Sequence, residues 1–178
     1  MKDEKLQRLR EVENLFDYFN DRVEAARFER SLAISDDTAL YLAQLLAERA
    51  RSDRPTPPFD TLAAIHGEAA HAPPGRSASL YRELGDRALY LLGCFRDHLD
   101  RARRPIGPAY YEDMGAAAYA SCDRVLKLWF SDAFGPVFRE LARKFGDCVQ
   151  VLESVKKADE DERITPSGLF VPGGVAEA

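Results

Sequence analysis

The sequence predicts an all-α protein, built as a single-domain bundle of about six helices. Apolar residues recur along most of the chain at steps of three and four, which is the spacing of one helical face. No segment shows the alternation of a β-strand, and no motif repeats at a fixed period. A chain of 178 residues, 46% of them apolar, is long enough to bury one sizeable core.

The N-terminal part of the chain is expected to form three helices. The first covers residues 3–30, and the second, capped by Ser35-Asp36-Asp37, ends near Arg51. Prolines within residues 54–58 stop the second helix, because proline lacks an amide donor and restricts the residue before it. A short third helix follows over residues 59–70. The apolar stripe of the first helix consists of Leu6, Leu9, Val12, Phe16, Phe19, Val23 and Ala26.

Three longer helices, over residues 77–103, 108–130 and 136–157, are predicted to pack as an antiparallel core. The first of them is apolar on more than one side, which is typical of a central helix. The second opens with a proline, which suits the first turn of a helix. The predicted core face of this second helix comprises Tyr111, Met114, Ala118, Cys122, Val125 and Trp129. Mid-helix glycines, which indicate close contact with a neighbouring backbone, are Gly85, Gly93 and Gly115.

Residues 1–157 are therefore assigned to one helical domain. Residues 158–178 are assigned to an acidic linker followed by an extended C-terminal tail. The tail carries the apolar triplet Leu169-Phe170-Val171, which is a candidate for docking on the same chain or on another one.

Composition and charge argue against several classes of function. The net charge of −5 argues against a nucleic-acid-binding protein, which normally carries a concentrated basic face. No apolar run reaches the ~20 residues of a membrane span, and the N-terminus lacks the pattern of a signal peptide. Three widely spaced cysteines form no disulfide framework. These observations predict a cytoplasmic protein with no membrane partner and no nucleic-acid partner.

The cysteines supply one candidate metal site. Cys94, Cys122 and Cys148 fall on three successive predicted helices, and the turns between these helices lie midway between them in sequence. Antiparallel packing would place the three thiols at one height, with His98 four residues after Cys94 on the same helical face. These ligands suit zinc or another soft metal. The favoured interpretation is inert core cysteines without a cofactor, because no Cys-x-x-Cys pair is present.

A second candidate site surrounds Gly85. Asp86 and Arg87 either lock the register of their helix as a partly buried pair or bind a ligand. Asp86 is also spaced to pair with Arg82 one turn earlier. Tyrosines nearby either line a pocket or lie at the edge of the core with hydroxyls in water, and those singled out are Tyr90, Tyr111 and Tyr119.

No catalytic residue is predicted. The chain contains no glycine-rich phosphate loop, nucleophile elbow or cysteine–histidine signature. His66 and His71 are five residues apart, which places their imidazoles on different sides of a helix.

The segments Asp86-Arg87-Ala88-Leu89-Tyr90-Leu91-Leu92-Gly93 and Tyr110-Tyr111-Glu112-Asp113-Met114-Gly115, with Ala118-Tyr119 after the second, resemble a family of uncharacterised bacterial all-helical proteins. The resemblance implies a bacterial cytoplasmic origin. No activity is assigned to that family, so it implies no catalytic or binding residue.

These observations favour a non-enzymatic helical interaction module, adaptor or regulatory, that forms a homodimer or binds a protein partner. The alternative is a small-molecule-binding or metal-binding bundle, with or without enzymatic activity. Its site would lie in the interior between the helices over 77–103, 108–130 and 136–157.

Overall fold

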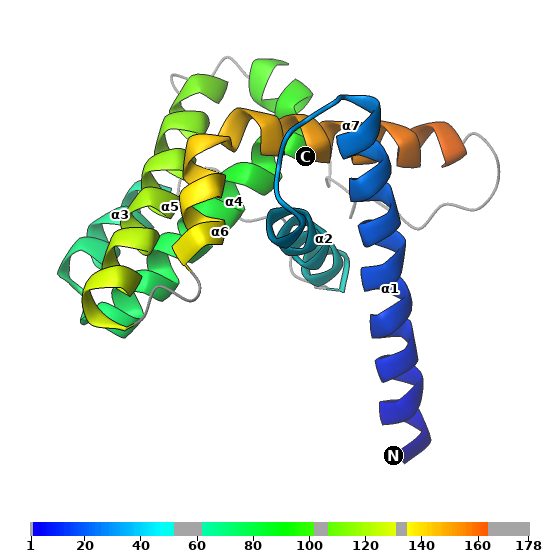
Figure 1. Ribbon diagram of the computed structural model, residues 1–178, viewed down its shortest axis with the longest axis horizontal. Coiled ribbons are helices and arrows are strands. Elements are labelled where there is room, and N and C mark those ends of the chain that lie inside the picture. The colour runs from blue at the N-terminus through cyan, green and yellow to red at the C-terminus, as the bar shows by residue number, and fades with distance from the viewer. Residues whose placement is uncertain (1, 52–61, 102–106, 131–134, 164–178) are drawn as a thin grey trace, which may run out of the picture.

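The computed structural model describes residues 2–51, 62–101, 107–130 and 135–163, and within them all regular secondary structure is α-helical (Figure 1). This confirms the predicted all-α fold. The described residues form seven helices: α1 (Lys2–Glu29), α2 (Asp36–Arg51), α3 (Leu62–His71), α4 (Pro74–Arg101), α5 (Pro108–Trp129), α6 (Gly135–Arg143) and α7 (Phe145–Arg163). No helix in these described ranges is both long and apolar enough to cross a membrane.

Helix α4 is central, as predicted, and packs against α3, α5 and α7. Its most extensive contact is with α5, which runs back along it, so that the end of α5 lies beside the start of α4. The helix begins at Pro74 rather than near residue 77, because a proline fits the first turn. At Phe95 the backbone leaves the helical conformation (φ −131°, ψ 21°) and the helix is kinked.

The predicted helix over residues 136–157 is divided in two. Lys144 separates α6 from α7. Apolar residues keep their helical spacing across this break, so the sequence pattern does not reveal it. Buried residues that continue this spacing include Phe138, Leu141, Phe145, Cys148, Leu152 and Val155. Helix α7 also continues to Arg163, into the predicted acidic linker. There Asp159 is buried and accepts a hydrogen bond of 2.7 Å from the Tyr18 hydroxyl.

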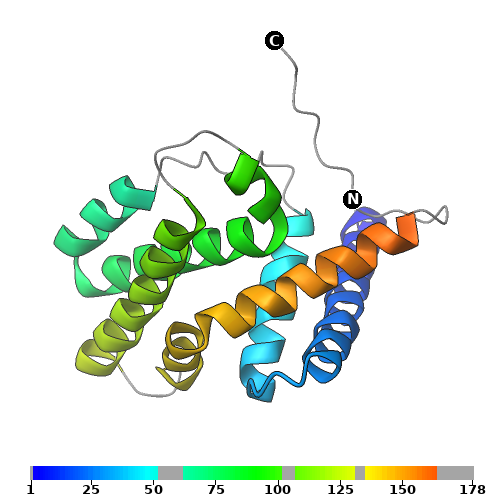
Figure 2. The same ribbon diagram turned by 90° about the horizontal axis from the view of Figure 1, so that it is seen from above.

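Helix α1 packs against α2 and α7 through Phe19, Val23 and Ala26, which are all buried. Figure 1 shows its N-terminal part extending beyond the other helices. Helix α7 runs across the molecule, with contacts to α4 and to α1 (Figure 2).

The three mid-helix glycines lie at close helix contacts, as predicted. A Cβ atom on Gly85 would lie 2.7 Å from the ring of Tyr119. A Cβ atom on Gly93 would lie 2.4 Å from the Cβ atom of Leu152, and one on Gly115 would lie 2.4 Å from the ring of Phe145. Glycine is therefore required for the spacing of α4 from α7 and of α5 from its neighbours.

Candidate functional site

A buried carboxylate, Asp86, joins α2, α4 and α5. The hydroxyls of Tyr41 on α2 and Tyr119 on α5 donate hydrogen bonds to its Oδ1 atom, at 2.6 and 2.7 Å. Arg82, one turn earlier on α4, places Nε 3.6 Å from Oδ2 and donates a 3.1 Å hydrogen bond to the Tyr41 hydroxyl. The ion pair between Asp86 and Arg82 that the sequence predicts is therefore present. Two tyrosines from other helices also bind the Asp86 carboxylate.

Burial dominates the electrostatics of this cluster. It raises the pKa of Asp86, although the hydrogen bonds from the two tyrosines and the charge of Arg82 act in the opposite direction. Burial and the adjacent Asp86 carboxylate raise the pKa of Tyr119 well above its usual value, and the same two causes act on Tyr41. Both phenols therefore stay protonated and act as donors. The arrangement suits a buried hydrogen-bond network that holds helices together better than it suits a general base.

Aromatic packing encloses the same cluster. Tyr119 is fully buried, stacks on Phe138 with ring centres 6.1 Å apart, and meets Tyr41 edge to face. Gly85 leaves the space for its ring. The predicted core-edge position, with hydroxyls in water, is therefore wrong for Tyr119, and Tyr111 is buried too. A helical pattern indicates on which face a tyrosine lies. It does not indicate that its hydroxyl donates a hydrogen bond to a carboxylate on another helix.

The other residues singled out near Gly85 make separate contacts. Arg87 forms an ion pair with Glu83, so Asp86 and Arg87 have different partners and do not act as the single predicted pair. Neighbouring residues on a helix point in different directions, which explains this. Tyr90 packs edge to face on Phe95, and Tyr111 packs in the same way on Tyr110.

The predicted cysteine site is not assembled. Cys94, Cys122, Cys148 and His98 all lie in the described part of the chain, and no three His, Cys, Asp or Glu side chains in that part are placed to hold a metal ion. The cysteines are free and buried, whereas His98 is exposed. The kink at Phe95 lies between Cys94 and His98 and breaks the four-residue spacing that would have put them on one face. Burial raises the pKa of each thiol to about 12.

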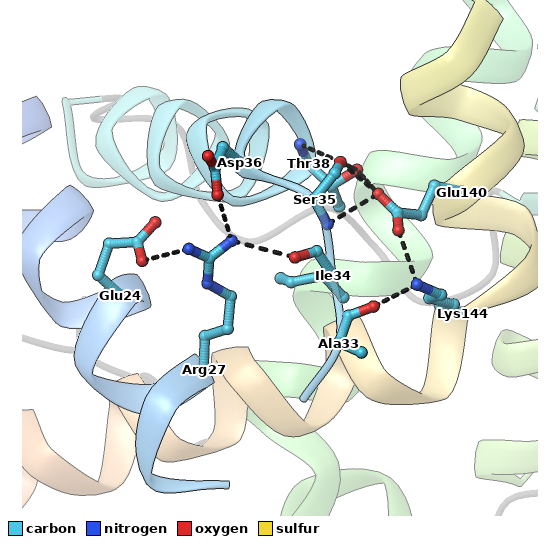
Figure 3. Close-up of polar contacts among 9 residues, drawn as sticks. All are labelled: Glu24, Arg27, Ala33, Ile34, Ser35, Asp36, Thr38, Glu140 and Lys144. Atoms are coloured by element: carbon cyan, nitrogen blue, oxygen red, sulfur yellow. Dashed lines mark hydrogen bonds and ion pairs between the residues drawn. The ribbon is translucent and has the colours of Figure 1, made fainter. Parts of the chain in front are cut away.

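A second polar cluster, centred on Glu140 of α6, fixes the start of α2 (Figure 3). Its Oε2 atom accepts hydrogen bonds from the backbone amide of Ser35 at 3.0 Å, from the Thr38 hydroxyl at 2.6 Å and from the Ser35 hydroxyl. Its Oε1 atom accepts one from Lys144 at 2.8 Å, and Lys144 also donates to the carbonyl of Ala33. Glu140 thus adds a carboxylate to the end of α2 that attracts negative charge.

Ser35 is the predicted N-cap of α2, and its hydroxyl accepts a 3.2 Å hydrogen bond from the Thr38 amide. On the other side of the loop, Arg27 of α1 donates to the carbonyl of Ile34 at 3.0 Å and to Asp36 at 2.8 Å. Partial burial opposes ionisation of Glu140, but the hydrogen bonds from Lys144, Ser35 and Thr38 lower its pKa to about 2. The sequence gives no sign of this cluster, because Glu140 lies far along the chain from the loop that it binds.

The end of α5 carries three consecutive exposed hydrophobic side chains. Leu128 is 72% exposed, Trp129 66% and Phe130 60%. We call these three residues the apolar end of α5. Trp129 was predicted to belong to the core face, and that prediction is wrong, because its side chain is exposed. Phe130 lies beside Gly75 at the start of α4.

Comparison with known proteins adds no assignment. No protein family matches the chain, and no curated protein or solved structure matches it either. The resemblance to a bacterial helical family stays a prediction.

Proposed function

We propose that this protein is a non-enzymatic interaction module whose contact surface is the apolar end of α5. The observation that carries the proposal is the exposure of Leu128, Trp129 and Phe130 in succession. Burial of a side chain of this size is worth roughly 1.5–3 kcal/mol, so a partner that covers all three gains substantial free energy. Clustered exposed hydrophobic residues typically mark interaction sites, whereas a single one such as Phe28 needs no explanation.

The surroundings of this surface support a protein partner or a second copy of the chain. Arg124 and Lys127 are exposed on the last turns of α5, next to the three hydrophobic residues. Asp123 pairs with Arg139 at 3.1 Å and with Lys127 at 3.8 Å. An apolar centre with a charged rim is the usual composition of a protein–protein contact.

The interior supports a structural role better than a chemical one. The three thiols have a pKa of about 12, so they are poor nucleophiles at neutral pH. Three free, buried cysteines are also consistent with a reducing cytoplasm, which we propose as the compartment. No cofactor forms part of the proposal.

The ligand-binding alternative rests on Asp86, since groups whose pKa is shifted by burial, as that of Asp86 is, occur often at functional sites. Two hydrogen bonds to its Oδ1 atom and an ion pair to its Oδ2 atom already occupy it. We therefore rank this alternative second.

In-cell photo-cross-linking tests the proposal. A photoreactive amino acid replaces Lys127, beside the apolar end, in one variant and Glu48, an exposed residue of α2, in a control variant. Both proteins are irradiated in the cells that naturally contain them. We expect discrete covalent adducts with protein from position 127 and few or none from position 48. Equal adduct yields at the two positions, or none at position 127, would contradict the proposal.

A further inference from the structure

We propose that the apolar end of α5 is covered by residues 164–178 of a second copy of this chain, with Leu169, Phe170 and Val171 as the docking residues. This inference rests on the proposed function, because it names the partner of the same surface. It is supported by the sequence of the segment, by the distance that the segment has to span and by the charge around the surface.

The segment is unusual in composition. Among residues 164–178 only Glu177 is charged, and three large apolar residues, 169–171, are consecutive. They match the apolar end of α5 in number and in kind, as each set contains one leucine and at least one aromatic residue. Mutual burial of two such triplets removes both from water, and aromatic side chains each contribute roughly 150–250 Å².

Distance favours a second copy over the same chain. Figures 1 and 2 show the end of α7 at Arg163 and the end of α5 on opposite sides of the molecule, with the whole length of α7 between them. A helix of 19 residues is about 28 Å long, and the end of α5 lies beyond its start. Phe170 is seven residues from Arg163, and an extended chain of that length spans at most about 25 Å. Residues 169–171 are therefore too close to Arg163 in sequence to reach the apolar end of α5 in the same chain.

Charge is complementary as well. The exposed cations Arg124 and Lys127 flank the apolar end, whereas the only charged side chain among residues 164–178 is the anion Glu177. The proposed contact involves only three large side chains from each chain, so its area is small. Interfaces below roughly 1,200 Å² are typical of weak, transient association. We therefore expect association at micromolar concentration rather than a permanent dimer.

Cross-linking between isotopically distinct chains tests the partner directly. Purified full-length protein with a photoreactive amino acid at position 127 is mixed with ¹⁵N-labelled wild-type protein, and cross-linked peptides are weighed. We expect links from position 127 to ¹⁵N-labelled peptides within residues 164–178. Links to the tail of the same chain alone would overturn the inference. So would links that avoid residues 164–178, although these would leave the apolar end as a contact surface.

Emission from Trp129 provides a second readout, because it is the only tryptophan of the chain. In wild-type protein, emission should shift to shorter wavelength as concentration rises and the indole is covered. The double variant Leu169→Ser/Phe170→Ser should weaken association about tenfold or more, the loss expected when two apolar side chains become polar. The control Phe170→Leu should retain it. Association of the serine variant with wild-type affinity would overturn the inference, whatever the result at the apolar end.

Discussion

Asp86 shows how one residue organises the interior. Its Oδ1 atom accepts hydrogen bonds from tyrosine hydroxyls on two other helices, and its Oδ2 atom lies near the guanidinium of Arg82 on its own helix. Without the Asp86 carboxylate, the hydroxyl groups of Tyr41 and Tyr119 would lose their acceptor. A buried donor without an acceptor costs about 1–3 kcal/mol. One side chain therefore links α2, α4 and α5.

Replacement of Asp86 tests this role. Asp86→Ala should lower the free energy of unfolding by about 2–4 kcal/mol, because both phenols lose their acceptor. Asp86→Asn keeps an acceptor oxygen and should cost less. Denaturation in urea measures both values. Equal losses for the two variants would contradict the hydrogen-bonding role.

The pH dependence follows from the same residue. Because burial raises the pKa of Asp86 in the folded protein, its carboxyl group binds a proton more tightly when folded. Its contribution to stability is therefore full below the unfolded pKa of about 3.9 and declines as pH rises through the folded pKa. The difference in unfolding free energy between wild type and Asp86→Asn should shrink as pH rises from about 3.5 towards neutrality. A growing difference would contradict the direction of this shift.

The cysteines give a second prediction at this scale. Since burial raises the pKa of Cys94, Cys122 and Cys148 to about 12, few thiolates are present at pH 8. A thiol reagent should modify native protein only at the rate of its unfolding and should modify all three cysteines at once in denaturant. Rapid modification of one cysteine in native protein would show that its surroundings are open.

At the scale of helices, glycine positions determine how closely α4 approaches its neighbours. Gly93→Ala places a Cβ atom 2.4 Å from the Cβ atom of Leu152, which cannot move away without moving α7. We expect a loss of about 1–3 kcal/mol or more in unfolding free energy. Gly67→Ala in α3 is the matched control: apart from its own helix, no atom of the described residues lies within 4 Å of its added Cβ atom. It should stabilise the protein by up to about 1 kcal/mol through helix propensity. A loss at Gly67 equal to that at Gly93 would argue against packing as the cause.

Glu140 joins α6 to the start of α2, and its removal should loosen that joint. Glu140→Gln should lower the unfolding free energy by about 1–3 kcal/mol at neutral pH, because it replaces charged hydrogen bonds. Glu153→Gln is the control, since its pair with Arg96 at 3.1 Å lies at the surface and should contribute at most about 1 kcal/mol.

The pH range of this effect is defined by the pKa of Glu140, which is about 2 in the folded protein against a usual 4.5. A lowered folded pKa gives stability that is present above pH 4.5 and is lost as pH falls towards 2. Wild type and Glu140→Gln should therefore converge in stability over this range. Parallel acid unfolding curves would contradict the assignment.

Helix periodicity predicted the elements well and their contacts unevenly. It located α4 and α5, and the glycines correctly indicated close packing. It did not reveal the division at Lys144, because the apolar spacing continues across that residue. It also assigned Trp129 to the core, since periodicity gives the face of a residue but not whether another element covers that face. Of the candidate sites, Asp86 and Tyr119 meet as part of one cluster, whereas Tyr41 and Glu140 become relevant only once distant segments are folded together.

At the scale of the whole molecule, the polar clusters at Asp86 and Glu140 both attach α2 to the rest of the bundle. Their polar groups are engaged in contacts between helices, whereas the apolar end of α5 belongs to neither cluster. This division of roles underlies the proposal that the protein acts by contact rather than by catalysis.

The most direct measurement of that claim is the yield of covalent adducts from position 127 in cells, with and without the apolar end. The variant Leu128→Ser/Phe130→Ser should keep the fold, because both side chains are already exposed, and circular dichroism checks this. We expect the double variant to lose most of its adducts while its thermal stability stays close to that of the wild type. An unchanged adduct yield in the folded variant would contradict it.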